Sequence, residues 1–226
     1  MRFGQRNDKH TQSKPGAMMM HELIEHPCVQ HKLSILRDAD TGHKRFRELA
    51  TEITEFLCYE ALKSVDVKKV KVQTPLAEAI CHKIDTDLVV VPILRAGVGM
   101  LDGILELVPT ARVGFVGLYR DENTKQPVAY YDRLPEQAEG GTCIVIDPMI
   151  ATGGSTVAAI DLLKKSGAGK IIVICIVTCP EGLARVENAH PDVRVYTAAV
   201  DDYLNENKYI VPGLGDAGDR LFGTSH

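Results

Sequence analysis

Two apolar runs of strand length indicate the architecture of this chain. Leu88–Leu94 and Ile171–Val177 are continuous and rich in β-branched residues. Runs of this kind are typical of strands buried on both faces, as in a parallel sheet that helices cover from both sides. Both are far shorter than the roughly 20 residues that a membrane-spanning helix needs. The runs therefore predict a soluble α/β protein without a membrane partner.

Strands and helices are predicted to alternate along most of the chain. Apolar residues recur at three- and four-residue steps over Thr41–Lys63, which predicts an amphipathic helix. The other predicted elements are the strands Leu88–Ile93, Ala111–Tyr119, Thr142–Ile146, Lys170–Thr178 and Val193–Val200, a helical stretch ending at Leu107, the helices Ser155–Ser166 and Pro180–Ala189, and an excursion or hairpin arm at Pro127–Leu134. The short turns between them favour a mostly parallel twisted sheet flanked by helices.

Length and composition fit one globular domain. The chain has 226 residues, of which 45% are hydrophobic and 25% charged. Residues 1–19 are polar and lack periodicity, which indicates a disordered extension or an expression remnant, so the domain is expected to span residues 20–226. The net charge of −4, from 26 basic and 30 acidic residues, disfavours a nucleic-acid partner. No secretory signal is evident, and the six cysteines contain no CxxC pair, so we expect reduced thiols and a cytoplasmic location.

The turn after the strand Thr142–Ile146 carries the most informative motif. Asp147 leaves the strand, and residues 148–156 (PMIATGGST) lead into a helix. The two glycines allow close approach to an anion, and hydroxyls with free N–H groups in the first helical turn can hold a phosphate. The plainer alternatives are an ordinary turn and Ser155 as a simple N-cap. The motif is neither a GxxxxGK[ST] loop nor a GxGxxG loop.

This motif resembles the phosphoribosyl-diphosphate (PRPP) motif of type I phosphoribosyltransferases. An acidic residue can accept hydrogen bonds from ribose hydroxyls while the loop holds the 5′-phosphate. Most members have two adjacent acids, whereas the single acid of Asp147-Pro148 is typical of uracil phosphoribosyltransferases. The resemblance implies that PRPP binds to Asp147, Pro148, Met149, Ile150, Ala151, Thr152, Gly153, Gly154 and Ser155.

A second resemblance to the same family lies at Tyr209–Arg220 (YIVPGLGDAGDR). Its glycines and proline disfavour regular structure and expose backbone amides, although a poorly ordered tail is the alternative. In the family this segment binds uracil through main-chain groups, which here are those of Ile210, Gly215 and Ala217. Asp216 falls at both the base site and the PRPP site.

Two arginines at predicted strand ends complete the resemblance. Arg95 follows the first central strand and Arg120 the next, and both positions match family residues that contact PRPP. A surface ion pair is the alternative for either arginine alone. His26 and His31 also match the family, and we assign them structural roles instead of metal binding.

The resemblance implies transfer of the phosphoribosyl group of PRPP to N1 of uracil, giving UMP and diphosphate. It implies Mg²⁺ held mainly by PRPP, without a dedicated protein metal site, and a homodimer or larger homo-oligomer, with GTP as a possible activator. The sequence identifies no catalytic general base. Three alternatives stay open: a PRPP-binding regulator of the same fold, a purely structural domain, and a phosphoribosyltransferase for another nucleobase.

Overall fold

A computed structural model describes residues 21–120 and 127–224, with Arg120 and Pro127 described by their backbone only. The predicted extension, residues 1–19, lies outside the described residues. The strands are β1 (His21–Leu23), β2 (Val67–Gln73), β3 (Glu78–Ile84), β4 (Leu88–Leu94), β5 (Arg112–Val113), β6 (Phe115–Arg120), β7 (Pro127–Arg133), β8 (Thr142–Ile146), β9 (Met149–Ile150), β10 (Lys170–Thr178), β11 (Arg194–Val200), β12 (Tyr203–Leu204) and β13 (Ile210–Val211). The helices are α1 (Pro27–Arg37), α2 (His43–Leu62), η1 (Ala96–Met100), α3 (Leu101–Leu107), η2 (Glu136–Ala138), α4 (Gly154–Lys165), α5 (Pro180–Ala189) and α6 (Ala217–Phe222).

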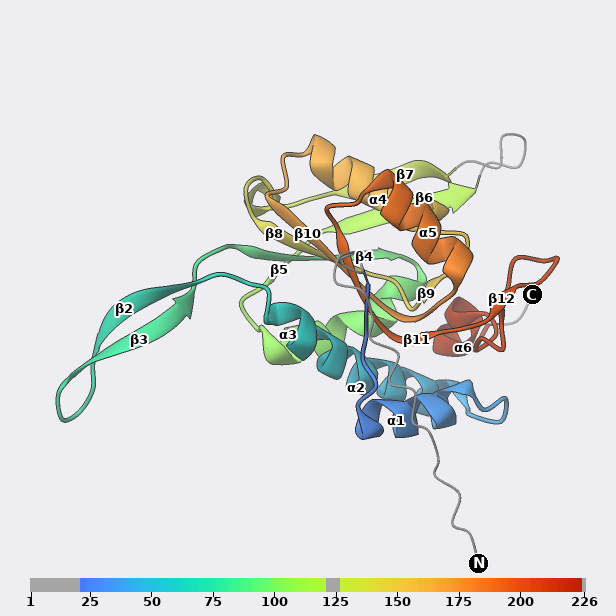
Figure 1. The fold of residues 1–226 in the computed structure, drawn as a ribbon, viewed down its shortest axis with the longest axis horizontal. Coiled ribbons are helices and arrows are strands. Elements are labelled where there is room, and N and C mark those ends of the chain that lie inside the picture. Colours follow the sequence, from blue (N-terminus) through green and yellow to red (C-terminus); the bar gives the residue numbers. More distant parts are fainter. Residues whose placement is uncertain (1–20, 121–126, 225–226) are drawn as a thin grey trace, which may run out of the picture.

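A nine-stranded sheet forms the centre of the molecule (Figure 1). Its main path runs β1-β11-β10-β8-β4-β6-β7, with β5 beside β4 and β9 beside β10. Neighbouring strands are parallel, except for the antiparallel pair β6–β7. The predicted mostly parallel sheet is confirmed. Within the described residues, no helix has the length and apolarity to cross a membrane.

Helices cover both faces of this sheet, and alternate residues of the central strands enter two separate cores. Val90 packs in the core formed with α1, α2, α3 and α6, whereas Val89 and Val91 pack in the core formed with α4 and α5. In β8, Ile144 joins the first core and Val145 the second. These strands are buried on both faces, which explains why they lack polar alternation.

Two predicted elements differ in detail from the structure. The predicted strand Ala111–Tyr119 is divided into β5 and β6 at Gly114, whose N–H donates to the carbonyl of Val90 at 2.9 Å. The predicted arm Pro127–Leu134 is β7, which pairs with β6 of its own chain and closes one edge of the sheet.

A hairpin formed by β2 and β3 was not predicted. It projects away from the rest of the molecule (Figure 1), and most of its residues are exposed, with Leu76 near its tip at 96%. In the second half of β2, Val70 and Val72 alternate with lysines, which is a strand signal. Both faces of the hairpin meet solvent, so the pattern of a buried strand is absent there.

The strand order places a topological switch point between β4 and β8. After β4 the chain continues through η1 and α3 on one face, whereas after β8 it enters α4 on the other (Figure 1). In parallel sheets, ligands bind outside the carboxyl ends of the strands where the connections diverge in this way. Leu94 and Ile146 end the two strands at this point.

Candidate functional site

The loop after β8 holds the predicted phosphate motif at the carboxyl edge of the sheet. The N–H of Asp147 donates to the carbonyl of Ile174 at 3.2 Å, which continues the β8–β10 pairing. Gly153, at φ 73°, is the N-cap of α4, so Ser155 is the second helical residue and its exposed side chain is not the cap. The alternative of Ser155 as a simple N-cap is wrong. Ser155 lies in the first helical turn, whose N–H groups have no partner within the helix.

The backbone carbonyls of three successive loop residues accept hydrogen bonds from side chains at the end of β10 and on α5. The donors are the Thr178 hydroxyl to Ile150 (2.9 Å), the Cys179 thiol to Ala151 (3.2 Å) and the Arg185 guanidinium to Thr152 (3.4 Å). The C=O and N–H of a trans peptide unit point in opposite directions. The N–H groups of residues 151–153 therefore point away from α5, which leaves them available to an anion.

Asp147 lies half-buried at the base of this loop. Burial raises the pKa of its carboxyl to about 7, and a long hydrogen bond from the N–H of Met149, at 3.5 Å, opposes that shift only weakly. A carboxylate that is costly to ionise alone gains from donors such as the vicinal hydroxyls of a ribose. The position suits the sugar-binding role that the motif predicts.

The loop after β4 lies against the loop after β8. A Cβ on Gly97 would lie 2.4 Å from the carbonyl oxygen of Ile146, so only glycine permits this approach. Arg95 precedes it with an exposed side chain, and the Leu94–Arg95 peptide bond is cis. The backbone of Arg120 ends β6 at the same edge of the sheet, and its side chain lies outside the described part of the structure.

An ion pair anchors the C-terminal segment to α1. The guanidinium of Arg37 donates to both carboxylate oxygens of Asp201, at 2.6 and 2.7 Å, and to the carbonyl of Gly213 at 2.6 Å. The N–H of Gly213 donates back to Asp201 at 2.8 Å. Arg220 adds a hydrogen bond to the carbonyl of Leu214 at 3.0 Å. The segment is a tightly held loop, so the alternative of a poorly ordered tail is wrong.

The backbone of Ile210 faces away from its partner strand. β12 and β13 are antiparallel, with Leu204 opposite Ile210, and the N–H of Asn205 donates to the carbonyl of Tyr209 at 2.9 Å. Bonded and non-bonded residue pairs alternate in such a ribbon, so Leu204–Ile210 is a non-bonded pair. The N–H and C=O of Ile210 are thus directed outward, as a main-chain contact to a base requires.

The remaining predicted base-site residues surround the start of α6. Asp216 is the N-cap, and its carboxylate accepts from the N–H of Asp219 at 2.9 Å. Ala217 is the first residue of the helix, so its N–H has no partner within the helix. Gly215 adopts φ 77°, a left-handed conformation that glycine favours.

The structure brings three of the predicted segments together. Gly97 joins the Arg95 loop to the end of β8, and Gly99 packs on Leu221 of α6, with its ideal Cβ only 2.5 Å from a Leu221 methyl. Arg185 was missed in the sequence because it is a lone arginine in a helix. The available signal was its place near the start of the helix that follows β10, because that helix begins at the carboxyl edge of the sheet.

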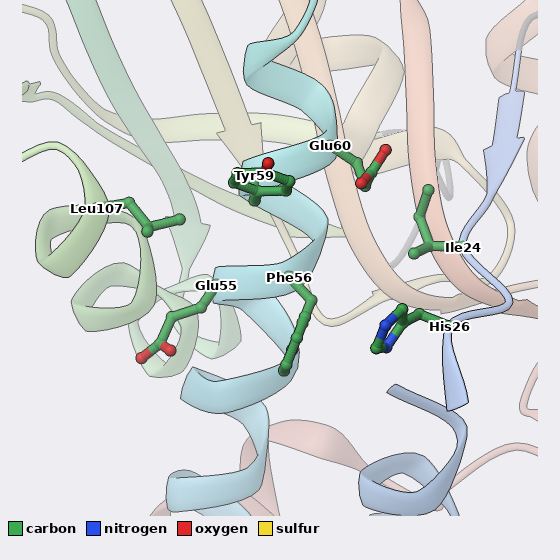
Figure 2. Close-up of a pocket in the computed structure, with 7 residues that line it drawn as sticks. All are labelled: Ile24, His26, Glu55, Phe56, Tyr59, Glu60 and Leu107. Atoms are coloured by element: carbon green, nitrogen blue, oxygen red, sulfur yellow. The ribbon is translucent and has the colours of Figure 1, made fainter. Parts of the chain in front are cut away.

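A separate hollow of about 380 Å³ lies between α2, α3 and the segment joining β1 to α1 (Figure 2). Its lining includes the stacked rings of His26 and Phe56, with centroids 5.6 Å apart, and the carboxylates of Glu55 and Glu60. None of the predicted PRPP- or uracil-binding residues lines it, and its acidic groups would repel an anionic substrate.

His26 has a structural role, whereas the role of His31 stays a prediction. The ring of His26 accepts from the N–H of Cys28 at 3.2 Å and caps α1, while His31 is exposed. No group of three or more His, Cys, Asp or Glu residues is placed to hold a metal in the described ranges. All six cysteines are free thiols.

A mostly parallel sheet covered by helices, with Asp147 and the predicted phosphate loop at its switch point, is the arrangement of a type I phosphoribosyltransferase. A model of the uracil phosphoribosyltransferase family matches residues 23–224. The uracil phosphoribosyltransferases of Symbiobacterium thermophilum and Streptococcus uberis are each 54% identical over 203 and 204 residues, which cover 89% and 90% of this chain and 97% and 98% of theirs. A solved structure of a protein from Aquifex aeolicus superposes with a TM-score of 0.86 at 38% identity, covering 91% of this chain and 99% of that one. The chain belongs to the uracil phosphoribosyltransferase family.

Proposed function

We propose that this protein transfers the 5-phosphoribosyl group of PRPP to N1 of uracil, releasing diphosphate and forming UMP. The observation that carries the proposal is the loop after β8. Side chains bind three of its carbonyls, and the amides of residues 151–153 point the other way, near Asp147. Family membership and the anchored C-terminal segment support uracil as the acceptor.

In this proposal PRPP lies along the carboxyl edge of the sheet. The carboxylate of Asp147 accepts hydrogen bonds from the ribose hydroxyls, and the amides and hydroxyls of residues 148–155 hold the 5′-phosphate. Arg95 and Arg120 neutralise the diphosphate. Anion binding at a glycine-rich turn and helix N-terminus supports the phosphate position.

Uracil lies against the C-terminal segment, where main-chain groups of Ile210, Gly215 and Ala217 recognise its carbonyl and N–H edges. Asp216 orients the substrates from the adjacent N-cap. Backbone recognition fits the geometry of the segment, because the Arg37–Asp201 pair fixes the loop that presents these groups.

The reaction forms the bond from uracil N1 to C1 of the ribose and breaks the bond from C1 to the diphosphate oxygen. The N1 proton leaves with no protein base assigned. The protein contributes position and charge, since diphosphate is already a good leaving group. Mg²⁺, which phosphoribosyltransferases generally use with PRPP, would be held by substrate oxygens and water and would neutralise diphosphate charge.

Base choice tests the proposal directly. The purified protein is incubated with PRPP, Mg²⁺ and one base at a time, and diphosphate release is measured. Uracil and 5-fluorouracil should react. Cytosine should be rejected by about 10⁴-fold, because its amino group replaces an acceptor and leaves two donors facing each other. Comparable turnover of cytosine or hypoxanthine would refute the uracil assignment, and failure with every base would favour a PRPP-binding regulator.

We also propose that the protein acts in the cytoplasm as a homodimer or larger homo-oligomer. The projecting hairpin supports assembly, because Val67 and Ile80 are each 58% exposed on it. Light scattering of the full chain and of a variant with the hairpin shortened should give different masses. GTP, the candidate activator, is tested by adding it to the diphosphate-release assay.

A further inference from the structure

We propose that Arg185 binds the 5′-phosphate of PRPP and of the product nucleotide. This inference rests on the proposed function, which places a phosphate at the start of α4. Arg185 lies on α5, outside the motif, and its side chain reaches across to the loop. A Cβ built on Gly154, the first residue of α4, would lie 3.3 Å from one guanidinium nitrogen of Arg185.

The phosphate loop contains no cation of its own. Residues 147–156 (DPMIATGGST) contain no lysine or arginine, and Asp147 is their one charged residue. The amino end of α4 offers the equivalent of only about half a positive charge. A phosphate monoester carries nearly two negative charges at neutral pH. A guanidinium beside Gly154 would supply the missing charge with donors that match phosphate oxygens.

The donors of Arg185 are available for this role. Because the amides of residues 151–153 face away from α5, the guanidinium must turn from the carbonyl of Thr152 past Gly154 to reach the phosphate. Its hydrogen bond to that carbonyl is long, at 3.4 Å, and the side chain is exposed. Among the described residues it forms no ion pair, not even with Glu181 one helical turn earlier. Arg37, by contrast, is committed to Asp201.

The glycines of the loop explain how an arginine on α5 reaches this position. An ideal Cβ on Gly153 would lie 2.8 Å from the carbonyl of Gly182 and 3.2 Å from the Cβ of Arg185. α5 therefore packs directly on the turn, without intervening side chains. A purely structural role, in which Arg185 only bonds Thr152, is the competing explanation that an experiment must separate.

The experiment measures binding of ribose 5-phosphate and, separately, of diphosphate by isothermal titration calorimetry. Ribose 5-phosphate carries the 5′-phosphate alone, whereas diphosphate occupies the opposite side of the site. Arg185→Gln keeps a hydrogen-bond donor for Thr152 but removes the charge, and Arg185→Lys keeps the charge. Arg112→Gln is the matched control, because Arg112 is exposed at the amino end of β5.

We expect Arg185→Gln to weaken ribose 5-phosphate binding about tenfold, with diphosphate binding changed less than twofold. Arg185→Lys should bind ribose 5-phosphate within about threefold of the unaltered protein, and Arg112→Gln should bind it as the unaltered protein does. In steady-state assays the KM for PRPP should rise while kcat and the KM for uracil hold. Unchanged ribose 5-phosphate binding in Arg185→Gln would overturn the inference, as would equal weakening of both ligands, or no binding to the unaltered protein. Loss of uracil turnover in the unaltered protein would instead refute the proposed function.

Discussion

Replacing Asp147 by Asn should make the protein more stable and less active, and the gain in stability should depend on pH. Burial raises the pKa of this carboxyl to about 7 in the folded protein, from an ordinary Asp value of about 4. The folded state therefore binds the proton more tightly than the unfolded state does. Ionisation of Asp147 costs nothing below about pH 4, costs progressively more up to about pH 7, and the cost is constant above that.

The magnitude follows from the same two pKa values. Each pH unit between them lowers the free energy of unfolding by about 1.4 kcal/mol. Between pH 5 and pH 8 the cost of ionising Asp147 grows only up to about pH 7. It therefore grows over about two pH units, which is at most about 3 kcal/mol. Asn carries no such penalty. The free energy of unfolding of Asp147→Asn, relative to that of the unaltered protein, should therefore rise by at most about 3 kcal/mol from pH 5 to pH 8. Each kcal/mol shifts Tm by roughly 2 to 4 °C.

Urea unfolding at pH 5, 6.5 and 8 measures the effect in the ligand-free protein. Asp40→Asn, at an exposed position between α1 and α2, is the control and should follow the unaltered protein at every pH. The same Asp147→Asn variant should use PRPP about ten- to a hundredfold less well, because charge-assisted hydrogen bonds contribute roughly 1.5 to 3 kcal/mol. A constant stability difference from pH 5 to pH 8 would refute the assignment of a half-buried, reluctantly ionised carboxylate. Unchanged constants for PRPP would refute its role in the site.

Three further substitutions test the packing around the site. Gly97→Ala should push the Arg95 loop away from β8, because its Cβ would lie 2.4 Å from a backbone carbonyl; kcat/KM for PRPP should fall at least tenfold, and an unchanged value would contradict the close approach. Gly153→Val places a β-branched residue at φ 73° and should lower stability by about 1 to 3 kcal/mol and raise the KM for PRPP. A thermal melt equal to that of the unaltered protein would contradict this expectation. Arg37→Ala leaves Asp201 buried without its partner and should cost about 3 to 5 kcal/mol, measured by urea unfolding; a loss below 1 kcal/mol would show that the pair does not anchor the C-terminal segment.

The local motifs were predictable because each is encoded in a short stretch of sequence. Asp147 and the glycines that follow it lie next to an apolar strand, so their place at the carboxyl edge follows from the strand alone. Long-range packing was not predictable in this way. Arg37 and Asp201 are 164 positions apart, and no local pattern marks them as partners. The hairpin of β2 and β3 was missed because its residues meet solvent on both faces, so burial leaves no signature in it.

The short 3₁₀ turn after β4 connects the two predicted substrate sites through Gly97 and Gly99. Residues two apart in a 3₁₀ turn point to different sides, since the turn has three residues per revolution. Gly97 accordingly approaches the end of β8, while Gly99 approaches Leu221 of α6. The first contact fixes the turn to the PRPP loop, and the second fixes it to the C-terminal segment. A side chain at Gly97 would meet the backbone of β8, whereas one at Gly99 would meet the buried side chain of Leu221, so these two glycines serve close packing.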